Sequence, residues 1–90
     1  MESEDNSKIY AYPNPFVDSF NLNFELDKDV QSAKICIFTE TGLNKLNYGL
    51  GALPKGKHSF VISPNVQKGT YIVHVMADNY DYQTIIFKKQ

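Results

Sequence analysis

The chain has 90 residues, a net charge of −1 and an aromatic fraction of 13% that consists entirely of Tyr and Phe. This length suits one domain with a single core and leaves no room for a deep, walled active-site cleft. The near-zero charge excludes a broad electrostatic field for nucleic acid or for an anionic membrane.

The first eight residues are predicted to form a flexible acidic linker. Residues 1–8 contain Glu2, Glu4 and Asp5 together with two serines, a composition typical of unstructured arms. They have no basic n-region and no hydrophobic h-region, so they do not form a signal peptide. If the protein is exported, we expect its signal to lie upstream in a larger precursor. No transmembrane segment is predicted, since no apolar run approaches the roughly 20 residues that span a bilayer.

The domain is predicted to span residues 9–90, where the pattern is β throughout and no window has helical periodicity. Residues 9–11 begin a first strand, which ends at Pro13 because proline has no N–H for a ladder. Tyr12 and Asn14 both precede a proline and are expected to be extended. The sequence therefore predicts a straight, poorly paired segment at a sheet edge.

The second strand is predicted over residues 19–26, where apolar and polar side chains alternate. A register slip of one residue would expose four large apolar groups, so we expect this register to be firmly set. The four apolar side chains are Phe20, Leu22, Phe24 and Leu26.

The middle of the chain predicts three further strands. Residues 33–38 are apolar at nearly every position, which suits a central strand, and a hairpin turn follows at Gly42. Residues 43–48 return as a weaker strand, after which Gly49 and Gly51 are expected to loosen the chain. A turn at residues 54–56 then leads to a strand over residues 58–62.

The end of the chain predicts a crossing between sheets and two last strands. Residues 64–68 are expected to cross, residues 71–77 and 82–87 to form the strands, and residues 78–81 to form the turn. Tyr71 follows Gly69 where a tyrosine corner sits in immunoglobulin-like domains. About seven short strands at intervals near ten residues predict an all-β, immunoglobulin-like sandwich of antiparallel strands.

No constellation for catalysis, metal or cofactor binding is predicted. The lone cysteine, Cys36, lies mid-strand between isoleucines and is expected to be a small buried side chain. His58 and His74, the bases that a Cys36 nucleophile would need, are expected to be structural because neither belongs to a ligand-spaced cluster. The sequence thus predicts no enzyme, no cofactor and no metal centre.

Charged and tyrosine side chains leave one binding alternative open. Five aspartates are placed at turns, and the lysines are scattered without a row of aromatics, so nucleic-acid binding is not predicted. Exposed aromatics line the glycan-binding face of many sandwich modules. The tyrosines that such a face would use are Tyr10, Tyr48, Tyr80 and Tyr82.

Three motifs taken together resemble a known family. They are Tyr12-Pro13-Asn14-Pro15-Phe16, Gly69-Thr70-Tyr71 and the tail Ile85-Ile86-Phe87-Lys88-Lys89, with the Thr41-Gly42 hairpin between the first two. Their order over nearly all of residues 9–90 resembles the C-terminal sorting domain of the type IX (Por) secretion system. Val66 departs from the leucine usual before the corner, and Gln90 follows the terminal lysines.

The resemblance implies a non-catalytic signal domain at the end of a larger exported protein of a Bacteroidota-type bacterium. The implied partners are a covalently linked N-terminal cargo, the type IX translocon with its shuttle components, and a sortase-like peptidase that cuts near residues 1–8. The implied location is the periplasm in transit, followed by the outer membrane, the cell surface or the medium. The alternative is a generic immunoglobulin-like adhesion or carbohydrate-binding module.

The resemblance also implies which residues the translocon recognises. An exposed strand edge can accept a partner strand while side-chain pockets provide specificity. Without the family, the terminal lysines would be assigned to solubility and edge protection. The residues expected to carry recognition are Pro13, Asn14, Pro15, Gly42, Gly69, Tyr71, Lys88 and Lys89.

Overall fold

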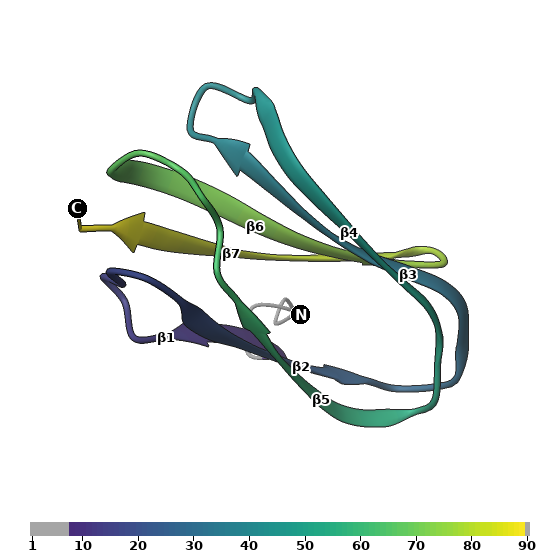
Figure 1. The fold of residues 1–90 in the computed structure, drawn as a ribbon. Coiled ribbons are helices and arrows are strands. Elements are labelled where there is room, and N and C mark those ends of the chain that lie inside the picture. The colour runs from purple at the N-terminus through teal and green to yellow at the C-terminus, as the bar shows by residue number, and fades with distance from the viewer. Residues whose placement is uncertain (1–7, 90) are drawn as a thin grey trace, which may run out of the picture.

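The computed structural model describes residues 8–89, which form two antiparallel sheets packed face to face (Figure 1). One sheet has the strand order β1-β2-β5 and the other the order β4-β3-β6-β7. The predicted all-β sandwich of about seven antiparallel strands is therefore confirmed; its assignment as immunoglobulin-like stays a prediction. The strands are β1 (Ile9–Tyr12), β2 (Phe20–Leu26), β3 (Val30–Thr39), β4 (Asn44–Leu53), β5 (Gly56–Ile62), β6 (Gly69–Ala77) and β7 (Tyr80–Lys88).

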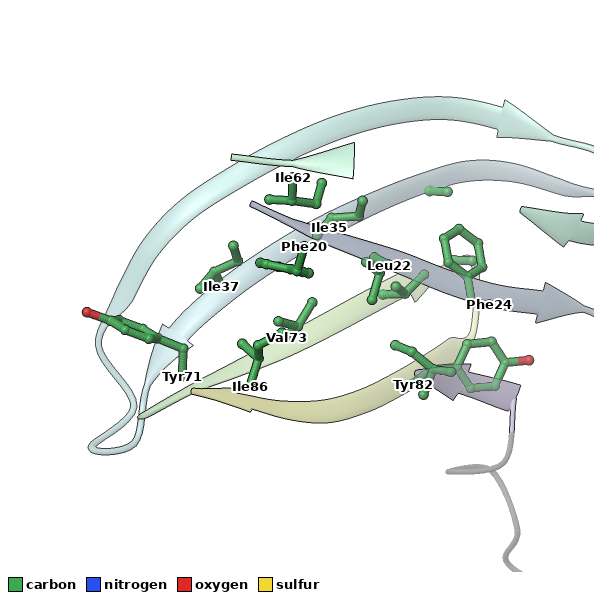
Figure 2. Close-up of a cluster of buried hydrophobic side chains, with 14 of the residues drawn as sticks. Phe20, Leu22, Phe24, Ile35, Ile37, Ile62, Tyr71, Val73, Tyr82 and Ile86 are labelled. Carbon is green, nitrogen blue, oxygen red and sulfur yellow. The ribbon is translucent and has the colours of Figure 1, made fainter. Parts of the chain in front are cut away.

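The core lies between the sheets and follows the predicted alternation of β2. Phe20, Leu22 and Leu26 are each at most 1% exposed, whereas Glu25 points to solvent. Figure 2 shows Phe20 and Leu22 among side chains of the facing sheet that include Ile35 and Val73. Because each buried large apolar side chain contributes about 2 kcal/mol, the register of β2 is strongly determined.

The strands of the four-stranded sheet are longer than the sequence indicates. The predicted end of this strand at Tyr48 is wrong, since β4 continues through Gly49 and Gly51 to Leu53. Its ladder with β3 is irregular at the two glycines, where Ala33 pairs with Gly51 and the next residue, Lys34, pairs with Gly49. Gly51 has a φ of 72°, which glycine adopts readily and which suits an irregular ladder.

The proline segment is bent, so the prediction of a straight segment is wrong. Residues 13–15 form a bend, and both X-Pro peptide bonds, Tyr12–Pro13 and Asn14–Pro15, are cis. The bend has a topological reason: the chain leaves β1 in one sheet and Phe16 pairs with Lys88 in the other. The predicted edge position of β1 is confirmed by the strand order.

The predicted tyrosine corner is confirmed. Residues 63–68 carry the chain from β5 in one sheet to β6 in the other, and Tyr71 begins its strand next to this crossing. The Tyr71 hydroxyl donates a hydrogen bond of 2.6 Å to the carbonyl of Gln67, and only 6% of the residue is exposed. This bond fixes the crossing against the core.

Candidate functional site

Residues 13–16 cover the free edge of β7 near its end, and we call them the edge clasp. The Asn14 side chain imitates a strand backbone: its Nδ2 donates to the carbonyl of Ile85 at 3.0 Å, and its Oδ1 accepts from the N–H of Phe87 at 2.9 Å. Phe16 continues with true backbone bonds, donating to the carbonyl of Phe87 and accepting from the N–H of Lys89, both at 2.8 Å. The edge clasp thus ties the first strand to the last.

The composition of the edge clasp explains its geometry. Pro13 and Pro15 have no N–H, so within the clasp only Asn14 and Phe16 offer donors to the edge of β7. Phe16 is 1% exposed and contacts Phe20 edge-on, with 4.9 Å between ring centroids. The Lys88 ammonium lies 5.6 Å from the centroid of the Phe16 ring, within the range of a cation–π contact.

The residues predicted to carry recognition gather at one end of the sandwich (Figure 1). Gly69 pairs with Lys88, and Tyr71 pairs with Ile86 on one side and with Thr39 on the other. Thr39 in turn accepts a hydrogen bond from the N–H of Gly42, so the hairpin turn belongs to the same end. Tyr71 is buried, and its hydroxyl is bonded within the chain.

An exposed apolar surface at the same end was missed by the sequence analysis. We call Phe38, Ile72, Ile85 and Phe87 the outer patch; the first three are side by side on adjacent strands. Ile85 is 53% exposed and Phe87 45% exposed, whereas the other two are half-buried. Contiguous exposed apolar side chains mark interaction sites more often than isolated ones do.

The sequence did contain a signal for the outer patch. Side chains alternate between the two faces of a strand, so three apolar residues in a row put apolar groups on both faces. Ile86 is 1% exposed and points into the core. Its neighbours Ile85 and Phe87 must therefore face outward. Lys88 follows the alternation of Ile86 and has its ammonium over the Phe16 ring, whereas Lys89 is exposed.

The candidates for nucleophilic chemistry, Cys36, His74 and His58, are divided between the two sheets. Cys36 is buried, as predicted, and occupies the position paired with His74. The His74 Nδ1 is 2.9 Å from Oδ1 of Asp81, and its ring contacts Phe38. Among residues 8–89 the structure records no hydrogen bond between Cys36 and His74. His58 lies on the other sheet, where its Nε2 is 2.8 Å from the carbonyl of Pro54.

Two of the five aspartates assigned to turns accept hydrogen bonds from backbone N–H groups, as the turn interpretation predicts. Asp29 accepts from the N–H of Lys55 at 2.8 Å, and Asp78 accepts from Gln31 and Ser32 at 3.1 Å. Asp27 accepts from the Lys8 ammonium instead, and Asp81 lies inside β7 and not in the turn. Within residues 8–89, no three side chains of His, Cys, Asp or Glu gather as a metal centre would require. The described residues include no helix with the length and apolarity that a membrane span requires.

The four tyrosines considered for glycan binding are not brought onto one face. Tyr10 is 56% exposed on β1 and stacks with Tyr12. Tyr82 is 4% exposed and stacks with Tyr80, which packs against the core, as does Tyr48 on β4.

A shallow groove lies at the other end of the three-stranded sheet. Its lining includes Tyr10, Asn23, Lys57 and Lys8. The Nδ2 of Asn23 is buried without a hydrogen-bond partner among the described residues. The ammonium of Lys8 donates a hydrogen bond to the carboxylate of Asp27, and this bond raises the pKa of Lys8 above its ordinary value. The groove contains none of the residues predicted for recognition.

Comparison with known proteins identifies a family. Residues 10–89 match the model of the family described as the secretion system C-terminal sorting domain. The match runs from β1 through the edge clasp and all seven strands to Lys89. No curated protein matches the chain.

Proposed function

The chain belongs to the family of secretion system C-terminal sorting domains, and from this membership we propose that it directs a covalently attached N-terminal cargo to the cell surface. The family indicates a sorting signal for type IX secretion and an interaction with that machinery. Its members are generally not catalytic. In the proposed route, the cargo waits in the periplasm of a Bacteroidota-type bacterium and then crosses the outer membrane.

The proposed recognition surface is the clasped end of the sandwich. The observation that supports it is the proximity of three motifs that are far apart in the sequence: the edge clasp, the Gly69–Tyr71 corner and the two lysines at the end of β7. In this proposal the translocon or its shuttle contacts the outer patch, the half-buried Lys88 side chain and the exposed Lys89 side chain. Gly42, Gly69 and Tyr71 hold the turns and the corner on which this surface rests.

The edge clasp changes how a partner reaches β7. Asn14 and Phe16 already occupy the backbone groups of Ile85 and Phe87, so a partner strand cannot add there while the clasp is in place. We therefore assign recognition at this end to side chains. Pro13 and Pro15 act indirectly, by giving the clasp its shape.

The remaining steps of the proposal concern the linker and the fate of the cargo. Residues 1–8 are proposed as the acidic linker in which a sortase-like peptidase cuts, with residues 9–90 as the sorting domain. Residues 1–7 and Gln90 lie outside the described part of the chain. The cargo then remains on the surface or enters the medium.

A reporter fusion tests the proposal. The 90-residue chain is attached to the C-terminus of a periplasmic reporter in a host with an active type IX system, and surface and periplasmic reporter are measured. We expect export of the fusion, and retention when residues 88–90 are deleted. Retention of the intact fusion in the periplasm refutes sorting, whereas export of the truncated fusion refutes only the function of the terminal lysines.

Matched substitutions test the outer patch. Ile85→Asp and Phe87→Asp place a charge in the patch, while Val61→Asp places one on the other sheet at a residue that is 68% exposed. We expect the first two to lower export by about tenfold, because desolvating one charge at an interface costs more than 1 kcal/mol. Protease resistance of the periplasmic fusions verifies that each domain folds. Equal export of all three variants contradicts recognition through the patch.

A further inference from the structure

The two sheets differ in width, so one strand of the wider sheet has no strand facing it. The four-stranded sheet has β4 and β7 at its edges, and the three-stranded sheet has β1 and β5. At one side of the sandwich the backbones of β1 and β7 lie close together, whereas at the other side, among the described residues, the backbones of β4 and β5 do not approach each other as closely. The place beside β5 and opposite β4 is where a fourth strand of the smaller sheet would lie (Figure 1).

The burial of β4 reflects this missing strand. Although β4 has ten residues, none of them is buried, and its inward positions are only half-buried. We call these inward side chains the open row: Leu46, Tyr48, Leu50 and Leu53, all of which pack against the core. Strands that have a strand of the other sheet facing them, such as β2 and β6, bury their inward residues almost completely. The open row is therefore an apolar surface that this chain covers only in part.

The edge of β5 offers the backbone groups that a further strand would need. Among the described strands, β5 pairs with β2 alone, from Gly56 to Ile62. Its other edge carries a row of N–H and C=O groups of the kind that accept an added strand. The opposite side of the sandwich lacks this opportunity near its end, because the edge clasp covers β7 there.

The segment that contains β4 and β5 carries side-chain charge of one sign. Residues 41–77 contain no Asp or Glu and four lysines: Lys45, Lys55, Lys57 and Lys68. Lys57 is exposed on the outer face of β5, between Glu25 of β2, with which it pairs, and the place of the missing strand. A partner with carboxylates on its outward side would be complementary.

We infer that β5 accepts an extended segment of another polypeptide as a fourth strand, apolar at alternate inward positions and acidic at outward ones. Its inward side chains cover the open row, and its carboxylates lie beside Lys57. This strand-acceptor site is on the side of the sandwich away from the edge clasp. It goes beyond the proposed function, because it requires no translocon and is measurable with the isolated chain.

Peptide binding tests the inference directly. The probe is a synthetic peptide of about eight residues, an ordinary strand length, that alternates valine with glutamate. One control has the same composition without alternation, and another replaces glutamate by lysine. With the intact 90-residue chain, we expect binding of the alternating acidic peptide alone, measured by fluorescence anisotropy, and slower hydrogen exchange of β5 amides on binding. Binding should weaken as salt is added.

Two matched pairs of variants locate the site. Leu50→Asp puts a charge in the open row, and we expect at least a tenfold loss of peptide affinity, whereas Leu43→Asp, at a residue 60% exposed in the hairpin, should have no effect. Lys57→Gln should weaken binding about threefold, as loss of one exposed ion pair implies. Its control, Lys34→Gln, removes the same charge from β3.

Several outcomes would overturn the inference. Equal binding of the peptide without alternation would show that charge alone attracts it. Exchange protection on β7 instead of β5 would place the acceptor edge on the wrong side. Self-association of the chain in sedimentation, with no peptide bound, would assign the β5 edge to a second copy. If Leu50→Asp does not fold, the comparison of Lys57→Gln with Lys34→Gln and the peptide controls still decides.

Discussion

Asn14 substitutes for a stretch of backbone at the edge of β7. Its amide group provides one donor and one acceptor in the arrangement that a neighbouring strand would present, and it bonds the carbonyl of Ile85 and the N–H of Phe87. Aspartate provides the acceptor but not the donor, and alanine provides neither. Comparing asparagine, aspartate and alanine at position 14 therefore distinguishes the contribution of the bond to Ile85 from that of the bond to Phe87.

We predict that Asn14→Ala lowers the free energy of unfolding by about 1–2 kcal/mol and that Asn14→Asp lowers it by less. The first loses two hydrogen bonds, while the second keeps the bond to Phe87. Urea unfolding measures both, and faster exchange of the Phe87 amide in the alanine variant assigns the effect to β7. Asn65→Ala, in the crossing between sheets, is the control. Equal losses for the alanine and aspartate variants would contradict the assignment of the Phe87 bond.

Tyr71 makes a separate test at the residue scale possible. Removing its hydroxyl leaves the ring in the core but deprives the carbonyl of Gln67 of this donor. We predict that Tyr71→Phe lowers the free energy of unfolding by about 1 kcal/mol, and that Tyr12→Phe, at a residue 51% exposed, has little effect. Thermal or urea unfolding compares them. If Tyr71→Phe and Tyr12→Phe have indistinguishable stabilities, the hydroxyl bond of Tyr71 does not stabilise the corner.

How well single residues could be predicted depends on the distance to their partners. The hydroxyl of Tyr71 bonds to Gln67, which is only four residues away, and the glycine before Tyr71 indicates the corner. The position of Tyr71 could therefore be predicted from the sequence. Asn14 bonds Ile85, 71 residues away, and nothing in the local pattern specifies that contact. The proline motif was therefore recognised as a feature of a family before its physical function could be derived.

At the scale of elements, the turn between β6 and β7 also fixes the start of β3. Asp78 has a φ of 52°, and its carboxylate accepts the N–H groups of Gln31 and Ser32. Its own N–H donates to the carbonyl of Ser32. One side chain thus joins two connections that are far apart in the sequence.

We predict that Asp78→Ala costs about 2 kcal/mol of stability, because alanine loses the acceptor and tolerates positive φ poorly. Asp78→Asn should cost clearly less, since asparagine keeps one oxygen and adopts this backbone conformation more readily. Asn79→Ala, in the same turn, is the control. The measurement is urea unfolding at neutral pH, and equal stabilities of the alanine and asparagine variants would count against the carboxylate contacts.

The elements differ in how much of them the sequence predicts. Alternation defined β2 to within a residue, because a strand buried on one face has a strict period. The extent of β4 was underestimated, since its glycines resemble breaks although the ladder with β3 carries it through them. Hydrogen bonding to a neighbour is a tertiary property, and single-strand patterns contain little information about it.

At the scale of the whole molecule, the two sides of the sandwich differ in how their edge strands are covered. One side is closed by the edge clasp, which joins β7 to the segment after β1. The other side leaves β4 without a facing strand and without a buried residue. Both β4 and β7 are edge strands of the same sheet, so they form a natural comparison for local stability.

We predict that β4 amides exchange hydrogen faster than those of β7, although both strands lie at edges, and that β3 and β6 exchange most slowly. Opening β4 exposes little buried apolar surface and breaks one ladder, whereas opening β7 also removes Ile86 from the core and breaks the bonds of the edge clasp. Native-state exchange followed by NMR measures the order. Asn14→Ala should then accelerate β7 and leave β4 unchanged; equal protection of the two strands in the unaltered chain would mean that the clasp adds nothing to the stability of its edge.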